Sequence, residues 1–361
     1  MNSIIIQGLI QFSASVVIAF FLLPLLIKAA PKLGLLDNPN ARKVHLKPTP
    51  LVGGLAMLII ILCAAIVGQL LSLPVLEHYE ILVATLLIFM VASWDDRAEL
   101  SPKVRLFIQI VAALFVAGSG IRIESLNGLF GIHELPLFAQ YALTILVITG
   151  VVNAFNLMDG VNGLVGGLAL VNALVLALLT WVVHMPELTM LLLALAGGLV
   201  VFLKYNSNPA KVFMGDGGSM MLGFLFAAIA IKVLQMTHIQ HKPAATLSLM
   251  VLTLFLIPVI DALRVFIFRF TKGLSILQPD KSHLHHLILI MGSSHSQVTG
   301  FIVGLQAVLI VAAPFLAAYC SVSVVIVFYI VLLVTLSKLL SFNRTMIDWQ
   351  NSVKQHEIIN N

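Results

Sequence analysis

The sequence has few charged residues and few cysteines. Only 10% of its 361 residues are charged, whereas 60% are hydrophobic, and its mean hydropathy is +1.08. A chain of this composition cannot cover a folded surface with polar groups, which excludes a water-soluble globular protein. The two cysteines, Cys63 and Cys320, lie far apart inside apolar segments. They form neither a disulfide framework nor a metal-binding pattern, so we expect them to be packing residues.

The sequence also lacks a convincing cleavable signal peptide. Its first apolar run, residues 4–30, is longer than a signal core and has no basic start. We therefore expect this run to be the first membrane span. The later apolar runs are continuous and do not show the alternation of a membrane β-barrel.

The apolar runs predict an all-α, polytopic integral membrane bundle with about eleven transmembrane helices of about 20 residues each. The expected span centres lie near residues 17, 61, 87, 112, 144, 173, 196, 226, 256, 309 and 331. The third span is the weakest prediction, because its apolar core, Ile81 to Ser93, is short.

Basic residues are scarce in the connections that follow the even-numbered spans. Those connections hold Arg122, Lys232 and Lys242, whereas the other connections and the tail hold the remaining 17 of the 20 Lys and Arg residues. The positive-inside rule therefore places the N-terminus outside and the C-terminus in the cytoplasm. Every aspartate also falls on the expected cytoplasmic side. An acid near a membrane boundary is commonly functional, so we expect the chemistry to face the cytoplasm.

The first two cytoplasmic connections carry clustered charge. In residues 35–54, LLDNPNARKVHLKPTPLVGG, Arg42 and His45 precede a glycine pair. This loop is either an anchor on anionic lipid or a segment that offers cations to phosphate. In residues 94–106, WDDRAELSPKVRL, adjacent Asp95 and Asp96 repel one another. They indicate a metal or a nearby Arg or Lys, and a helix cap with a solvated turn is the alternative.

Residues 153–164, NAFNLMDGVNGL, interrupt the apolar sequence at the end of the fifth span. Asn153, Asn156 and Asp159 share one face if the span continues through them as a helix. Gly160 and Gly163 would then end the helix and let backbone approach a ligand. Such groups can bind a sugar, a base or hydrated Mg²⁺. Hydrogen bonding between helices is an alternative for Asn153, but it explains Asp159 poorly.

Residues 211–224, KVFMGDGGSMMLGF, place Asp216 between glycines where the eighth span begins. A carboxylate beside free backbone N–H groups at a helix N-terminus predicts a cradle for diphosphate and metal. The segment is not a P-loop, because no Gly-Lys-Ser/Thr follows. The alternative is a glycine turn capped by Asp216.

Residues 259–289 carry an acid, a base and a histidine cluster. Asp261 and Arg264 are spaced to pair on one helix face. His283, His285 and His286 follow in the next connection. There are no cysteines nearby and a single loop does not give a good tetrahedral zinc set. We expect these imidazoles to contact phosphate or sugar oxygens.

Together these stretches resemble the polyprenyl-phosphate N-acetylhexosamine-1-phosphate transferases, which are integral membrane enzymes. The matching features, in the family's order, are the basic loop ending in PLVGG, Asp95-Asp96, NAFNLMDGVNGL, FMGDGGS, the Asp261–Arg264 pair and HLHH. HLHH and the eleven expected spans are more similar to the undecaprenyl-phosphate N-acetylglucosamine-1-phosphate branch than to the muramoyl-pentapeptide branch. The family commonly shows DGxDG where this chain has Asn162 as the second polar residue, and an amide cannot act as a base or nucleophile.

The resemblance implies transfer of N-acetylglucosamine 1-phosphate from UDP-N-acetylglucosamine to undecaprenyl phosphate, with Mg²⁺ or Mn²⁺ and release of UMP. This is the first membrane step of O-antigen, common-antigen or related envelope glycan synthesis. It also implies one transmembrane catalytic domain, residues 1–361, in the bacterial cytoplasmic (inner) membrane, ending in a short cytoplasmic tail, residues 342–361. No nucleic-acid partner is expected, and the sequence leaves a homodimer open.

By analogy with the family, Asp216 is the principal metal ligand, and Asp95, Asp96 and Asp159 are catalytic. The expected substrate-binding residues are Arg42, His45, Lys103, Asn153, Asn156, Asn162, Asp261, Arg264, His283, His285 and His286. A phosphate monoester is largely dianionic at neutral pH, which favours direct attack over an aspartyl-phosphate intermediate.

Two alternatives remain at this point. The first is the same reaction with another UDP-N-acetylhexosamine or with UDP-MurNAc-pentapeptide. The second is a transporter, since intramembrane carboxylates also mark ion pathways. A transporter is disfavoured because the acids gather at one face and no inverted repeat is found.

Overall fold

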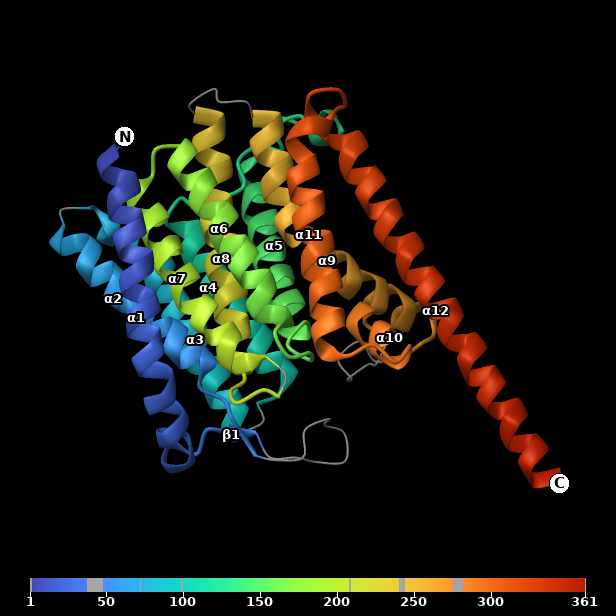
Figure 1. Ribbon diagram of the computed structural model, residues 1–361. Coiled ribbons are helices and arrows are strands. Elements are labelled where there is room, and N and C mark those ends of the chain that lie inside the picture. Colours follow the sequence, from blue (N-terminus) through green and yellow to red (C-terminus); the bar gives the residue numbers. More distant parts are fainter. Residues whose placement is uncertain are drawn as a thin grey trace.

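The computed structural model describes residues 2–37, 48–71, 73–98, 100–207, 209–239, 244–274 and 282–360. Figure 1 shows long helices side by side in one bundle, with the two termini at opposite ends. The helices are α1 (Asn2–Leu33), α2 (Gly53–Leu70), α3 (Tyr79–Ala98), α4 (Pro102–Gly118), α5 (Leu137–Leu157), α6 (Leu164–Val182), α7 (Pro186–Asn206), α8 (Gly215–Ile239), α9 (Ala244–Thr271), α10 (Leu284–Ile290), α11 (His295–Ala317) and α12 (Val322–Asn360). Two short 3₁₀ helices, η1 (Val75–His78) and η2 (Leu129–Gly131), and two short strands, β1 (Leu36–Asp37) and β2 (Thr49–Pro50), lie in the connections.

Ten helices in the described part of the chain are long and apolar enough to cross a membrane. The remaining predicted span, centred near residue 112, corresponds to α4, which has 17 residues. α4 nevertheless packs against α3 and α5 in the bundle, and its ends lie near the two ends of α8. Near its start Arg105 lies 3.5 Å from Asp216 in the first turn of α8, and just past its end the carbonyl of Gly120 accepts a hydrogen bond from Gln235 of α8. The predicted all-α, polytopic membrane architecture is confirmed.

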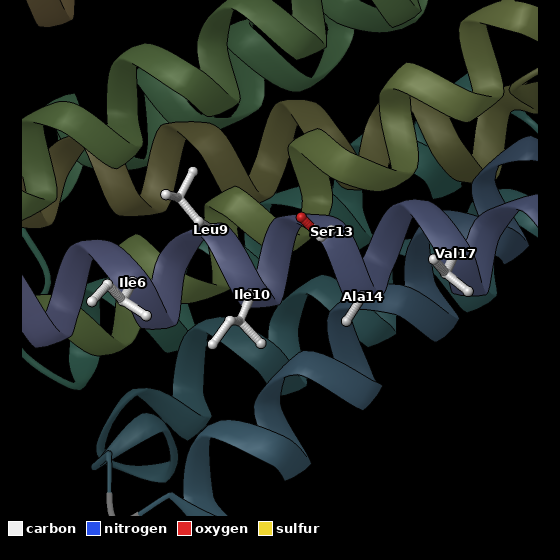
Figure 2. Close-up of a pocket in the computed structure, with 6 residues that line it drawn as sticks. All are labelled: Ile6, Leu9, Ile10, Ser13, Ala14 and Val17. Atoms are coloured by element: carbon white, nitrogen blue, oxygen red, sulfur yellow. The ribbon is translucent and has the colours of Figure 1, made fainter.

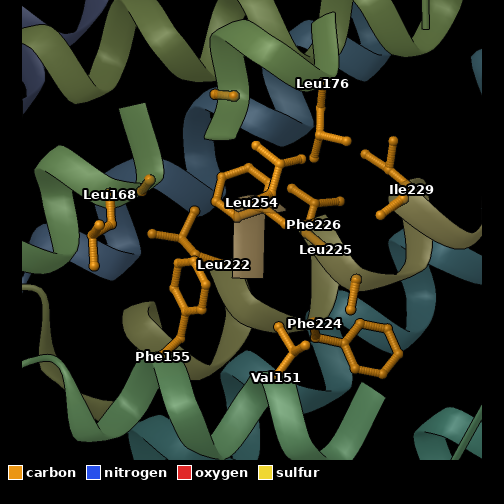
Figure 3. Close-up of a cluster of buried hydrophobic side chains, with 14 of the residues drawn as sticks. Val151, Phe155, Leu168, Leu176, Leu222, Phe224, Leu225, Phe226, Ile229 and Leu254 are labelled. Atoms are coloured by element: carbon orange, nitrogen blue, oxygen red, sulfur yellow. The ribbon is translucent and has the colours of Figure 1, made fainter. Parts of the chain in front are cut away.

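The centre of the bundle is α8, which contacts α2, α3, α5, α6 and α9. Figure 3 shows apolar side chains converging around it, among them Phe155 of α5, Phe226 of α8 and Leu254 of α9. Lipid tails are as apolar as these side chains, so helix association in a membrane depends on close packing and often on small residues. Gly54 of α2 and Gly218 of α8 approach so closely that a Cβ on either would clash with the other backbone. This contact brings the starts of α2 and α8 together.

The outer face of α1 is apolar. Figure 2 shows a shallow depression there, lined by Ile6, Leu9, Ile10, Ser13, Ala14 and Val17. Leu9 and Ile10 are each 62% exposed. In a membrane protein such a face is suited to contact with lipid chains. Ser13 is the polar residue among those that line the depression.

The last helix extends well beyond the bundle. α12 continues without a break from Val322 to Asn360, and Figure 1 shows its C-terminal part projecting past the neighbouring helices. The segment predicted as a short tail is therefore, in its described part, a helical extension of the last span.

The two short strands flank the basic first loop. β1 pairs antiparallel with β2, with Leu36 opposite Pro50. The backbone N–H of Phe213 donates to the carbonyl of Pro50 at 2.8 Å, which fixes this strand pair beside the loop that leads to Asp216. Arg42 and His45, predicted to bind substrate, lie between the strands and outside the described residues.

Candidate active site

Most of the predicted site residues meet at one end of the bundle. They come from the end of α3, the starts of α4 and α8, the end of α5, and the α9–α10 connection. Helix ends leave backbone N–H and C=O groups without intrahelical partners, so this end of the bundle supplies binding groups as well as polar side chains.

Asp216 lies in the first turn of α8. Its Oδ1 accepts a hydrogen bond from Asn156 Nδ2 at 2.9 Å, and its Oδ2 lies 3.5 Å from Arg105 Nη1. The preceding residue, Gly215, has φ +76°, a conformation that favours glycine. The Asp216 side chain is 37% exposed. The neighbouring amide and guanidinium therefore orient a carboxylate that keeps oxygen lone pairs available for a cation.

Asp95 and Asp96 have different protein partners. Asp96 accepts hydrogen bonds from the backbone N–H groups of Asp216 at 3.1 Å and Gly217 at 3.3 Å, so it caps α8 from a neighbouring helix. Asp95 pairs with Arg105 Nη1 at 2.8 Å. Their mutual repulsion is thus relieved by a helix N-terminus and by a guanidinium. The basic residue of this connection that meets the acids is Arg105, whereas Lys103 is exposed.

Asp159 lies in a turn just past α5. The helix ends at Leu157, so Asn153 and Asn156 share its last turns, and the condition for a shared helical face that includes Asp159 is not met. The physical reason is the glycine-rich sequence that follows, in which Gly163 has φ +80°. Desolvation, followed by the negative charges of Asp216 and Asp96, raises the pKa of Asp159 to about 8. A nearby cation would favour its ionised form.

Asn206 connects the Asp159 turn to the loop before Asp216. The backbone N–H of Gly163 donates to Asn206 Oδ1 at 2.6 Å. The Asn206 Nδ2 group donates to the carbonyl of Val212 at 2.7 Å. Asn206 ends α7 and is buried, so one amide holds both acid-bearing segments.

The backbone of Asn162 is held by the first turns of α11. Its N–H donates to His295 Nδ1 at 3.2 Å, and its carbonyl accepts from Thr299 Oγ1 at 2.8 Å. Asn162, which departs from the family pattern, therefore sits in a turn whose backbone is held by two helices, α11 and, through Asn206, α7.

Asp261 is surrounded by protein donors. Its Oδ1 accepts from Arg264 Nη2 and from the backbone N–H of Leu284, each at 2.9 Å. Its Oδ2 lies 2.9 Å from His283 Nδ1, and the side chain is 2% exposed. The predicted pair with Arg264 is present, and it holds the start of α10 against α9. Asp261 therefore positions the histidine segment.

Of the remaining two histidines, His285 lies against the Asp159 turn and His286 lies beside His285. The rings of His285 and His286 are 4.2 Å apart between centroids. Burial, followed by the neighbouring His286, lowers the pKa of His285 to about 3, so its imidazole is neutral at physiological pH. A Cβ placed on Gly160 would lie 2.9 Å from His285 Nε2. Glycine at this position lets the turn approach the histidine.

A cavity of about 540 Å³ lies between the helices that carry many of these residues. Its walls are formed mainly by α4, α5, α9 and α10. Six predicted residues line it: Asn153, Asn156, Asp159, His283, His285 and His286. The wall beyond them, along α4, α5 and α9, includes apolar side chains, among them Leu106, Leu146, Leu263 and Phe266.

Four polar residues of the cavity wall were not singled out from the sequence. They are Arg105, Gln109, Thr149 and Arg269. Arg105 and Gln109 are four residues apart on a mostly apolar helix, and this spacing, which puts both on one face, was the available signal. Arg269 is buried at the end of a span, where a basic residue is readily taken for a membrane anchor.

The oxygen donors near Asp216 fit Mg²⁺ better than zinc. In the part of the chain that the structure describes, no three His, Cys, Asp or Glu side chains form a metal-binding group. Zinc sites need three or four protein ligands, whereas Mg²⁺ commonly uses one or two carboxylates with water and substrate phosphate. Asp216, with the Asn156 amide beside it, meets the second requirement.

The fold and the site define a membrane-embedded enzyme with its acids and amides gathered at one end of a helical bundle. Residues 78–234 match the profile of glycosyl transferase family 4. The chain is 32% identical over 278 residues to an undecaprenyl-phosphate alpha-N-acetylglucosaminyl 1-phosphate transferase of Yersinia pestis, covering 75% of this chain and 73% of that protein. The protein of that name from Escherichia coli K12 is 30% identical over 304 residues, covering 81% and 79%. A probable undecaprenyl-phosphate N-acetylglucosaminyl 1-phosphate transferase of Bacillus subtilis is 29% identical over 331 residues, 90% of each chain.

This chain belongs to glycosyl transferase family 4. It is therefore a transferase, and the transporter alternative does not hold.

Proposed function

We propose that this protein transfers N-acetylglucosamine 1-phosphate from UDP-N-acetylglucosamine to undecaprenyl phosphate, releasing UMP. The names of the similar proteins support this acceptor and this sugar. The observation that carries the proposal is the cavity, which is polar at the helix ends and apolar along α4, α5 and α9. A soluble nucleotide sugar and a phosphate on a long apolar chain need such a combination.

The donor diphosphate would bind at the start of α8. Asp216 would hold Mg²⁺ or Mn²⁺, with the Asn156 amide fixing the carboxylate. The ion would supply positive charge to the diphosphate oxygens as charge develops on them. Asp159 and the turn after it would contact the nucleotide sugar. His285, as a neutral imidazole, would form a hydrogen bond with a phosphate or sugar oxygen.

The acceptor phosphate would approach from the apolar side of the cavity. Arg105 lies between that side and Asp216 and can attract the phosphate. Because a phosphate monoester is largely dianionic at neutral pH, direct attack on the donor needs little base catalysis. This agrees with the structure of the acid pair, in which Asp95 holds Arg105 and Asp96 caps α8.

We place the active site at the cytoplasmic face of the bacterial inner membrane. The distribution of basic residues supports this orientation. The product, undecaprenyl-diphospho-N-acetylglucosamine, would serve O-antigen, common-antigen or related envelope glycan synthesis.

The direct test is UMP release by purified protein in detergent, with undecaprenyl phosphate and a panel of UDP-sugars, with and without EDTA. We expect release with UDP-N-acetylglucosamine that stops when EDTA is added. Release with another UDP-hexosamine alone would replace the sugar in the proposal. No release with any donor would overturn it.

A further inference from the structure

A pair of amide side chains lies in the cavity wall one helical turn beyond Arg105. Gln109 of α4 is four residues further along the same helix face, about 6 Å deeper along the helix axis. It lines the cavity and is 1% exposed. Asn153 of α5 faces it, with Asn153 Nδ2 at 2.7 Å from Gln109 Oε1.

The hydrogen bonds fix which atoms of this pair remain for a ligand. Asn153 Nδ2 also donates to the backbone carbonyl of Thr149 at 2.7 Å. A carbonyl oxygen can only accept, so the Asn153 atom facing Thr149 must be nitrogen. Both of its hydrogens are then used, and the Gln109 atom facing it must be oxygen. Gln109 Nε2, with two N–H groups, is left over, and the described residues provide it with no partner.

The surroundings of Gln109 indicate the chemistry of that ligand. Arg105 lies on one side, towards Asp216. Apolar side chains, including Leu106, Leu146 and Phe266, lie in the same wall. Amide N–H donors next to a guanidinium suit an oxyanion, and the apolar wall suits a hydrocarbon chain attached to it.

We propose that Gln109 binds the phosphate of the polyprenyl phosphate acceptor through Nε2, and that Asn153 is a positioning residue that holds Gln109 in this orientation. The inference rests on the proposed function. Of the two proposed substrates, the acceptor combines an oxyanion with an apolar chain, whereas the donor diphosphate belongs at the start of α8. Gln109 would thus be a second phosphate-binding group, one helical turn further along α4 than Arg105.

The test is the steady-state kinetics of Gln109→Met, which removes the N–H donors and keeps the approximate side-chain length. A hydrogen bond to a charged group changes binding about 10- to 100-fold, so we expect the KM for undecaprenyl phosphate to rise by about that factor. The KM for UDP-N-acetylglucosamine should change less than about threefold. Gln109→Glu keeps the oxygen that accepts from Asn153 but removes the N–H donors, and it should raise the acceptor KM at least as much.

The matched control is another buried amide pair in the same bundle. Gln306 of α11 donates from Nε2 to Asn172 Oδ1 of α6 at 2.7 Å, and both residues are 0% exposed. Gln306→Met should lower thermal stability without changing the KM for either substrate. It therefore separates loss of an interhelical hydrogen bond from loss of a ligand contact.

Binding without turnover gives a second readout. Native mass spectrometry of the full chain with undecaprenyl phosphate or undecaprenol, and no UDP-sugar, should show a preference for the phosphate that shrinks in Gln109→Met. An unchanged acceptor KM and preference in folded variants would overturn the inference, as would a rise in the donor KM alone. A wild-type chain that releases no UMP would overturn the proposed function itself.

Discussion

At the scale of single residues, the Asp216 carboxylate is the group on which the site depends most. We expect Asp216→Ala to lower kcat at least about 100-fold, because it removes the main oxygen ligand for the metal at the diphosphate. Thermal stability should change little, since the side chain is partly exposed. UMP release and the melting temperature measure the two effects.

Glu124 at the opposite end of the bundle is the control for Asp216. It is 38% exposed and its Oε1 lies 3.7 Å from Arg122 Nη2, so it resembles Asp216 in exposure and in having a guanidinium neighbour. Glu124→Ala should keep full activity. Full activity in Asp216→Ala would remove the metal assignment.

Asp159 gives a prediction about pH. Its carboxyl has a pKa of about 8 in the fold and an ordinary value of 3.8, so between these values the folded state binds more protons than the unfolded state. Its contribution to stability is full below pH 4 and falls as pH rises towards 8. In EDTA, Asp159→Asn should therefore gain melting temperature relative to wild type from pH 5 to pH 8. A difference in melting temperature between the two proteins that stays constant from pH 5 to pH 8 would contradict the raised pKa of Asp159.

At the scale of elements, Asn206 links the turn after α5 to the loop before α8. Because it bonds both Gly163 and Val212, Asn206→Leu should increase amide hydrogen exchange in both segments together. We expect kcat to fall about tenfold, since misplacement of catalytic groups is costly. Asn172→Leu, which removes a buried amide from α6, should leave exchange in both segments unchanged. Faster exchange in one segment alone would show that Asn206 does not couple them.

The helices were predictable from the sequence, and the connections between them were only partly so. Bilayer thickness sets the length of an apolar span, so the runs marked the spans directly. α4 was found because its apolar run is continuous, although it has only 17 residues. The end of α5 at Leu157 is followed by a turn in which Gly160 lies against His285 and Gly163 against Thr299. These are tertiary contacts, which helical spacing does not contain.

The candidate site was likewise predictable only in part from the sequence. Asp159, Asp216 and the histidines stood out because polar residues are rare in this sequence. Their partners did not: Arg105 looked like one more basic residue of a cytoplasmic loop, and Asn206 like the polar end of a span. A partner between helices is set by their packing, and the spacing of residues within one helix does not show which helices meet.

At the scale of the whole molecule, the structure gathers the site residues at one end of the bundle, and the basic residues predict that this end faces the cytoplasm. Cysteine labelling tests the orientation in a variant without Cys63 and Cys320. Ser207→Cys lies at the site end and Glu134→Cys at the opposite end, and both positions are exposed. In intact spheroplasts a membrane-impermeant maleimide should label position 134 and spare position 207. The reverse pattern would place the active site outside.

The most direct test of the central claim follows the phosphorus atoms of the donor. Purified protein is incubated with undecaprenyl phosphate, Mg²⁺ and UDP-N-acetylglucosamine labelled with ³²P in the β-phosphate. Transfer of the sugar together with its phosphate predicts that the label enters the lipid product and that unlabelled UMP is released. Label that leaves as UDP, with an unlabelled glycolipid, would show that the sugar alone is transferred and would contradict the proposed reaction.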